Sequence, residues 1–185
     1  MRTPDKGIPQ ELLEKAKCVA IVPGEEKLAF IFGGNYGKGV ATCRTDHGWS
    51  APMFIAVGGG SVGFQIGGSF TDVVMLFLND HALQSLLSDK FKIGADATVA
   101  AGPVGRHDAA DTDVKLNAEI LSYSRSKGVF AGVSVDGAVV QADKSGDGAM
   151  YGASTTRQEI LHGRVHVPKA ARSLLAELTR YSAHS

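Results

Sequence analysis

The chain has 185 residues and carries 19 Lys plus Arg against 19 Asp plus Glu, so its formal net charge is zero. This length suits one domain with a single hydrophobic core, and a balanced charge gives no general attraction to nucleic acid, so we expect no nucleic-acid partner. No apolar run approaches the roughly 20 residues of a membrane span, and the N-terminus has no apolar signal core. We expect a soluble chain, with an export signal removed from the mature protein as an open alternative.

The first part of the sequence predicts a short helix followed by strands. Pro9 stands near the start of the helix, which carries a narrow apolar stripe. The segments 18–23, 27–32 and 39–44 have the apolar, β-branched character of strands, and the turn-rich GGNYGKG joins the last two into a hairpin. The stripe is too small for strong interfacial anchoring, so the helix is expected to stabilise the fold. Its residues are Leu12, Leu13 and Ala16.

The segment 48–77, GWSAPMFIAVGGGSVGFQIGGSFTDVVMLF, predicts a tightly curved sheet. Apolar residues recur in it at strand spacing around repeated glycines. Glycine weakens a strand and is kept where a sheet bends, where two backbones approach closely, or where a ligand lies against the main chain. Sheet curvature and close packing are the favoured explanations here.

The second half continues the sheet between two helices. Asn79 or Asp80 can cap a helix whose leucines follow a three-four spacing, and Pro168 opens a final helix. Strand character returns at 92–101, at AEILSYSRS and GVFAGVSV, and at AVVQAD after an Asp-Gly turn, whereas GPVGRHDAADTD and the region of Gly146 and Gly148 are expected to be loops. The predicted class is α+β: a curved or barrel-like, mainly antiparallel, glycine-rich sheet with a few short flanking helices.

Motifs for catalysis, cofactors and metals are incomplete. Gly58-x-Gly60-x-x-Gly63 has the spacing of a dinucleotide fingerprint, but strand-like sequence follows it where a helix is required. His162 and His166 flank a glycine and lack zinc-ligand partners, and the acidic residues around His107 lack the pattern of an EF-hand. We therefore expect no enzyme activity, no cofactor and no bound metal.

Basic residues indicate a binding surface. A regular strand through residues 121–127 would present Tyr123, Arg125 and Lys127 on one face, where an aromatic ring and two cations suit an anionic head group. An ordinary solvated strand face is the alternative. Four more cations are expected to widen the patch or to be plain surface charge: Lys38 and Arg44, which flank the first hairpin, and Lys90 and Lys92, which follow the second helix.

The two cysteines, Cys18 and Cys43, fall in neighbouring strand candidates. They would face each other if the first strands form a meander, and export of the chain would permit a disulfide. Two buried, reduced thiols are an equally open alternative.

Several blocks of the sequence, taken in order, carry a family resemblance. They are IPQELLEKAKCVAIVP, GKGVATCR, GWSAPMFI, GGSVGFQIGG, DVVMLFLN, AEILSYSRSKGVFAGVSVDGAVV and MYG. This combination resembles the SYLF domain, a family of lipid-binding and actin-bundling proteins, and the tail is similar to that of bacterial stand-alone members. The resemblance covers about 8–152 of a single domain spanning 1–185, with 153–185 as a C-terminal helical extension.

The resemblance implies a non-enzymatic module that binds anionic lipids, phosphoinositides in eukaryotes, at a membrane surface. In some fungal members the same region binds actin filaments, so a protein-interaction or scaffold module is the first alternative, and a cofactor-binding enzyme is a more distant one. Similarity to bacterial members implies a periplasmic or envelope-associated protein if a signal was removed, and otherwise a cytosolic protein peripheral to a membrane.

Overall fold

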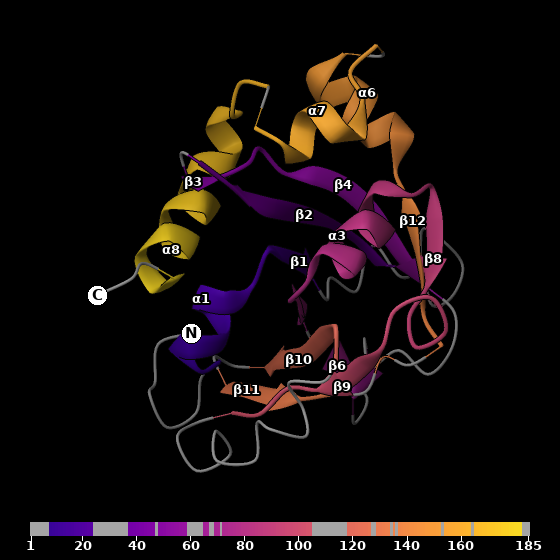
Figure 1. Ribbon diagram of the computed structural model, residues 1–185, viewed down its shortest axis with the longest axis vertical. Helices are drawn as coiled ribbons and strands as arrows, with labels where there is room; N and C mark the ends of the chain where they lie inside the picture. The colour runs from indigo at the N-terminus through magenta and orange to yellow at the C-terminus, as the bar shows by residue number, and fades with distance from the viewer. Residues whose placement is uncertain are drawn as a thin grey trace.

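The computed structural model describes residues 8–23, 37–46, 48–58, 65–66, 69–70, 72–104, 118–126, 129–133, 135, 137–152, 154–163 and 165–182. The expected α+β class is confirmed: a curled sheet shaped like half a barrel carries a few short helices (Figure 1). The strand expected at 27–32 and the glycines of 59–64 lie outside the described residues.

The main sheet has the strand order β11-β10-β7-β1-β2-β4-β12-β8, and each of these neighbours pairs antiparallel. In addition, β3 pairs with β2, β9 runs parallel to β10, and β5 and β6 form a separate two-stranded sheet. The strands are β1 (Cys18–Val22), β2 (Gly37–Thr45), β3 (Gly48–Trp49), β4 (Met53–Gly58), β5 (Gln65–Ile66), β6 (Ser69–Phe70), β7 (Asp72–Phe77), β8 (Lys90–Lys92), β9 (Val99–Ala101), β10 (Ile120–Ser126), β11 (Val129–Gly132) and β12 (Val139–Ala142).

Some of the helices begin after a residue whose side chain accepts a hydrogen bond from a free N–H group of the first turn. Asn79 accepts a hydrogen bond from the Ala82 N–H (2.9 Å), as the sequence predicted, and Thr156 forms a capping box with Glu159. The helical segments are α1 (Gln10–Lys15), α3 (Asp80–Leu87), α6 (Lys144–Tyr151), α7 (Arg157–Leu161), the 3-10 turn η2 (Lys169–Ala171) and α8 (Arg172–Ser182). None of the described helices is long and apolar enough to cross a membrane.

Helix α6 replaces the loop expected around Gly146 and Gly148, so that expectation was wrong. Asp143 caps the helix by accepting from the Gly146 N–H (3.0 Å). A Cβ on Gly146 would lie 3.0 Å from the Phe54 side chain, so the glycine lets α6 pack closely on β4. Packing has outweighed the low helix propensity of glycine.

Both faces of the sheet are buried over much of its area. The inner face carries Cys18, Ala20 and Val22 of β1 and packs against α3 and α7. The outer face carries Val19 of β1, and its buried part packs against α1 and α8, which lie beside each other in Figure 1. Successive side chains of a strand point to opposite faces of the sheet. The register of β1 with its neighbours therefore decides which residues of those strands belong to the inner core and which to the outer core.

Glu119 joins the start of α3 to the segments that lead into β9 and β10. Its carboxylate accepts hydrogen bonds from the Thr98 N–H (2.9 Å), from Asn79 Nδ2 (3.2 Å) and from His81 Nδ1 (2.6 Å). Desolvation alone would raise the pKa of Glu119, but these bonds outweigh it and hold the pKa below its ordinary value.

The depressed pKa makes a prediction about stability and pH. A carboxylate with a lowered native pKa stabilises the fold above its unfolded pKa of about 4.3 and loses that contribution as the pH falls through the native value. Glu119→Gln should therefore be less stable than the parent in urea unfolding at neutral pH, and the gap should close in acid. A gap that persists unchanged in acid would contradict this account.

Helix α1 makes a second prediction. Leu13 is only 3% exposed and packs in the outer core with residues of α8. Leu13→Ala should lower the free energy of unfolding by about 2 to 3 kcal/mol, the range for a buried leucine whose site partly collapses. The exposed Glu11→Ala on the same helix is the control. Unchanged stability combined with lost vesicle binding would instead make α1 a membrane anchor.

Candidate functional site

Tyr123, expected as a surface aromatic, is fully buried. Its hydroxyl donates to the Pro103 carbonyl (2.8 Å), and Gly102 lies so close that a Cβ there would be 2.1 Å from the tyrosine ring. Burial raises the pKa of Tyr123. The side chain belongs to the outer core, and Gly102 and Pro103, which follow β9, lie against it, so the expected contact of Tyr123 with a head group is wrong.

Arg125 remains at the surface, with half of its side chain exposed. Its guanidinium lies 3.8 Å from Asp72 Oδ2 and 6.0 Å from the centre of the Phe130 ring. Lys127 lies outside the described residues. Asp72 offsets the charge of Arg125, so this end of β10 attracts an anion more weakly than the sequence predicted.

Arg44 binds helix α1 instead of facing solvent. Its Nε donates to the Ala16 carbonyl (2.9 Å), its Nη2 donates to the Leu13 carbonyl (2.6 Å), and its guanidinium lies 4.6 Å from the Trp49 ring centre. Desolvation lowers the pKa of Arg44, and the carboxylate of Glu14 opposes that shift. Arg44 thus donates to carbonyl groups at the end of α1. The expectation that it belongs to a lipid-binding patch is therefore wrong.

The structure brings the other three predicted cations together on the outer face. Lys38 of β2 pairs with Ala56 of β4, Ala56 pairs with Gln141 of β12, and Gln141 pairs with Lys90 of β8. Lys92 follows two residues later on the same side of β8. Strand spacing places Lys38 and Lys90 roughly 14 Å apart and Lys90 and Lys92 roughly 7 Å apart. We call Lys38, Lys90 and Lys92 the lysine band.

The members of the band differ in how free their charges are. Lys38 Nζ lies 3.3 Å from Asp143 Oδ2, and that carboxylate is mostly buried. Lys90 and Lys92 are exposed on the edge strand, and within the described ranges no salt bridge engages them. Their charges are therefore available to an outside anion, whereas that of Lys38 is partly offset.

A second polar cluster joins α6 and α7 to β4. Asp147 Oδ1 accepts from the Phe54 N–H (2.7 Å), Arg157 Nη2 donates to the Leu86 carbonyl (2.9 Å), and Arg157 Nη1 lies 3.5 Å from Asp147 Oδ2. Desolvation raises the pKa of Asp147, opposed by the Phe54 and Arg157 interactions, and desolvation lowers that of Arg157. Next to them, Tyr151 donates to the Pro52 carbonyl, and burial together with Asp147 raises its pKa to about 12.

This cluster borders a surface groove of about 400 Å³ between the end of α3, α6 and α7. Sequence reasoning missed it because an aspartate between two glycines resembles a loop residue, and no spacing links it to Arg157. The lining residues are Leu87, Asp89, Lys144, Asp147, Gly148, Gly152, Thr155, Thr156, Arg157 and Gln158.

The histidines do not gather into a metal site in the part of the chain that is described, where no three metal-ligating side chains come together. His162 and His166 are both exposed, and His107 lies outside the described residues.

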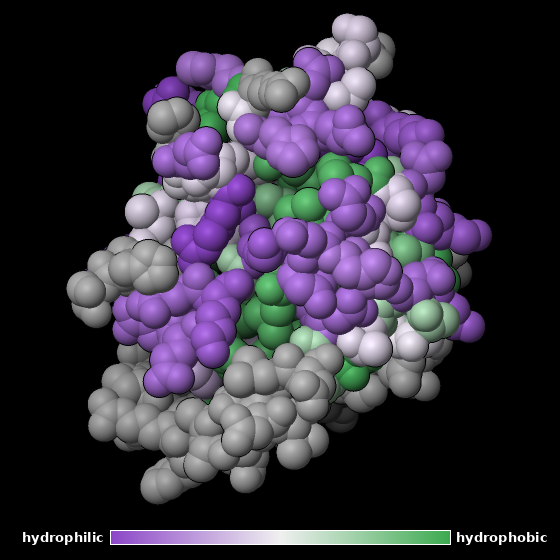
Figure 2. Space-filling view, viewed as in Figure 1, coloured by the Kyte–Doolittle hydropathy of each residue, from purple (hydrophilic) through white to green (hydrophobic). Residues whose placement is uncertain are grey.

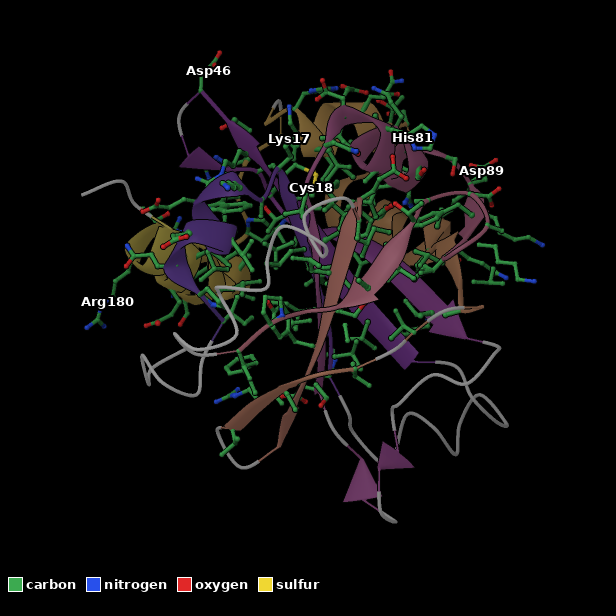
Figure 3. The ribbon with its side chains drawn as sticks, turned by 60° about the horizontal axis from the view of Figure 1, so that its bottom comes forward. Lys17, Cys18, Asp46, His81, Asp89 and Arg180 are labelled. Carbon is green, nitrogen blue, oxygen red and sulfur yellow. A yellow bond between two sulfur atoms is a disulfide. The ribbon has the colours of Figure 1, made fainter. Side chains whose placement is uncertain are left out.

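The cysteines form a disulfide between the two central strands (Figure 3). Cys18 and Cys43 stand opposite each other in the antiparallel register, with their Cα atoms 4.0 Å apart, and both are buried in the inner core. Of the two alternatives that the sequence left open, the structure has the bridge.

The disulfide closes a sequence separation of 25 residues, which corresponds to about 3.5 kcal/mol in the chain-entropy treatment. Replacing both cysteines by alanine should lower the free energy of unfolding by up to that amount, measured in urea. Thiol titration of the unfolded, non-reduced parent should find no free thiol. Two titratable thiols would show that the bridge does not form.

Comparisons with known proteins place these features in context. Residues 58–181 match a family model, Ysc84, described as "Las17-binding protein actin regulator". The chain is 37% identical to Protein YSC84 of Saccharomyces cerevisiae, over 92% of the chain and 37% of that protein. It is 35% identical to LAS seventeen-binding protein 3 of the same organism, over 94% of the chain and 39% of that protein. It is 31% identical to SH3 domain-containing YSC84-like protein 1 of Xenopus laevis, over 97% of the chain and 54% of that protein. The chain thus spans between a third and about half of the length of these relatives.

Proposed function

Because this chain belongs to the Ysc84 family, we propose that it is a non-enzymatic binding module, and that it binds anionic lipid head groups at a membrane surface through the lysine band. The family description and the names of these relatives speak of binding and regulation, and none of them names a reaction.

The observation that carries the lipid proposal is the exposed pair Lys90 and Lys92 on one face of β8. Two ammonium groups on one side of a strand approach a planar anionic surface together, and each contributes on the order of 1 kcal/mol there. Half-buried apolar side chains lie on the same outer face, at Val139 of β12 and Ala56 of β4. They add a limited apolar contact beside the charges.

Nearby carboxylates moderate this attraction. Asp143 offsets Lys38, Asp89 lies 3.2 Å from Lys144, and Asp96 Oδ2 accepts from the Lys92 N–H (2.7 Å). Binding should accordingly be weak and peripheral, and it should fall as salt shortens the Debye length.

Charge reversal tests the lipid proposal. The parent should co-sediment with vesicles containing phosphatidylserine and much less with neutral phosphatidylcholine vesicles. Lys90→Glu with Lys92→Glu should abolish that preference with little change in melting temperature, because both side chains are exposed. The matched control, Lys169→Glu with Arg172→Glu, changes the charge equally at exposed positions near the start of α8 and should bind like the parent.

Three outcomes would contradict the proposal. If the folded Lys90 and Lys92 variant binds vesicles as the parent does, the lysine band is not the lipid site. If the control variant loses binding equally, the loss reflects the net charge of the protein and not the position of the lysines. A parent that is indifferent to lipid charge and to salt removes the electrostatic mechanism. Arg125→Glu forms a separate arm that tests the other end of the sheet.

A protein partner is the second candidate function, favoured by the description of the family as actin regulators. Co-sedimentation with actin filaments in the absence of lipid separates the two: pelleting with filaments by the parent and by the charge-reversed variant alike supports a partner site away from the band.

The disulfide supports a proposal about location. A buried intrachain bridge persists in oxidising compartments, so we propose a periplasmic or envelope-associated protein, although the relatives named above are eukaryotic. Alkylation of intact cells before lysis, followed by thiol mapping, tests it: modified cysteines would indicate a reducing compartment.

A further inference from the structure

The groove between α3, α6 and α7 adjoins the start of β8, since its lining includes Asp89, the residue before Lys90. In Figure 1, α6 and α7 lie side by side at the top, above α3. Figure 2 shows hydrophilic side chains over this side of the molecule, with hydrophobic ones visible in the spaces between them. The volume of about 400 Å³ falls within the range of small-ligand sites.

The charges that line the groove cancel. Lys144 and Arg157 contribute two positive charges, and Asp89 and Asp147 contribute two negative ones. A phosphate or carboxylate placed against Arg157 would also meet the buried carboxylate of Asp147, and a cation placed against Asp147 would meet the guanidinium. The lining therefore disfavours either kind of ion and suits a neutral polar group.

Two buried atoms in this lining have no hydrogen-bond partner among the residues that the structure describes. They are Asp147 Oδ2, which accepts, and Arg157 Nε, which donates. The side chains are 7% and 11% exposed, and the 3.5 Å between Nη1 and Oδ2 is longer than the 2.7 to 2.9 Å typical of a charge-assisted hydrogen bond. The two side chains are thus close enough to attract each other electrostatically, but no short hydrogen bond joins them.

We infer that this groove binds an uncharged, extended polypeptide segment through the main-chain N–H and C=O of one of its residues. In an extended segment, the N–H and the C=O of one residue point to the same side, so a single residue can offer its N–H to Asp147 Oδ2 and its C=O to Arg157 Nε. Leu87 adds an apolar wall, and Thr155, Thr156 and Gln158 give polar edges. The occupant is a segment of a protein partner, and the inference is independent of lipid binding by the lysine band.

Binding requires a small separation of α6 from α7, since neither unpartnered atom is exposed to solvent. Each helix is fastened to the rest of the protein by its own bonds: Asp147 holds the Phe54 N–H, and Arg157 holds the Leu86 carbonyl. Gly152 follows α6 on the way to α7 and has a φ of 104°, a conformation that glycine adopts freely and that is strained for other residues. Opening the α6–α7 seam would lengthen the two 3.5 Å contacts of Arg157 Nη1, with Asp147 Oδ2 and with the Phe54 carbonyl, while the shorter bonds to the Phe54 N–H and the Leu86 carbonyl are kept.

The test uses the blocked peptide N-acetyl-glycyl-glycine N-methylamide, which has main-chain amides and no charge. Titration to about 100 mM into nitrogen-15-labelled protein suits the weak affinity of so small a ligand. Saturable shifts are expected at the amides of Phe54 and Asp147 and at Arg157 Nε–H. Sodium acetate, inorganic phosphate and glycerol, tested separately, should not reproduce them.

Asp147→Asn keeps an oxygen for the Phe54 N–H but replaces the free acceptor by a donor. It should weaken peptide binding about tenfold or more, as expected for loss of a hydrogen bond to a charged group. Asp89→Asn, which removes an exposed carboxylate from the same groove, is the matched control and should change the affinity by less than threefold. Gln158→Trp provides a second variant, because a bulky ring at this exposed lining position should block the groove without touching the buried pair.

Absence of saturable shifts would overturn the inference and would leave the two atoms to bind water. Equal shifts with acetate or phosphate would make the groove an anion site, and equal losses in Asp89→Asn and Asp147→Asn would remove the role of the buried pair. If Asp147→Asn fails to fold, undiminished peptide binding by Gln158→Trp has the same force against the inference.

Discussion

The pairing of β1 with β2 is the constraint on which the rest of the structure depends. These strands lie in the middle of the eight-strand order, and the disulfide joins them at Cys18 and Cys43 on the inner face. Their backbones approach so closely that a Cβ on Gly39 would lie 2.3 Å from the Ile21 carbonyl oxygen. With this register fixed, alternation assigns every residue of the neighbouring strands to the inner or the outer face, and a slip of one residue would exchange the two cores.

The outer face divides into a covered part and an open part, and Arg44 marks the boundary. Its bonds to the carbonyls of Leu13 and Ala16 hold the end of α1 over the central strands, where α8 joins it. Beyond this cover lies the lysine band, with Lys38 on β2, Lys90 and Lys92 on β8, and β4 and β12 between those two strands. Arg44 therefore has a structural role, because it holds α1 in place. Since α1 does not cover Lys90 and Lys92, those two lysines stay exposed, and basic residues of similar sequence context have different roles.

Sequence reasoning recovered what depends on local pattern. Strand alternation, the Asn79 cap and the neighbouring positions of the cysteines are read from adjacent residues, and the ordered blocks led to the SYLF resemblance, which the family match confirms. Sequence reasoning failed where the environment of a residue depends on an element far away in the chain. Alternation cannot say that Gly102 and Pro103 cover Tyr123, and glycine propensity cannot say that Gly146 is needed for contact with Phe54. Lys90 and Lys92 were found by composition, but their alignment with Lys38 required the register of four strands.

The Asp147–Arg157 pair is poorly explained by stability alone. Removing two charges from water costs several kcal/mol per ion, and mutual attraction offsets this only when the remaining donors and acceptors are satisfied. Here one acceptor and one donor are left over among the described residues, although Asp147 Oδ1 accepts from the Phe54 N–H of β4 and Tyr151 donates to the Pro52 carbonyl just before that strand. The arrangement makes more physical sense as a contact that is completed by a third group, and the α6–α7 seam is where the described structure leaves room for one.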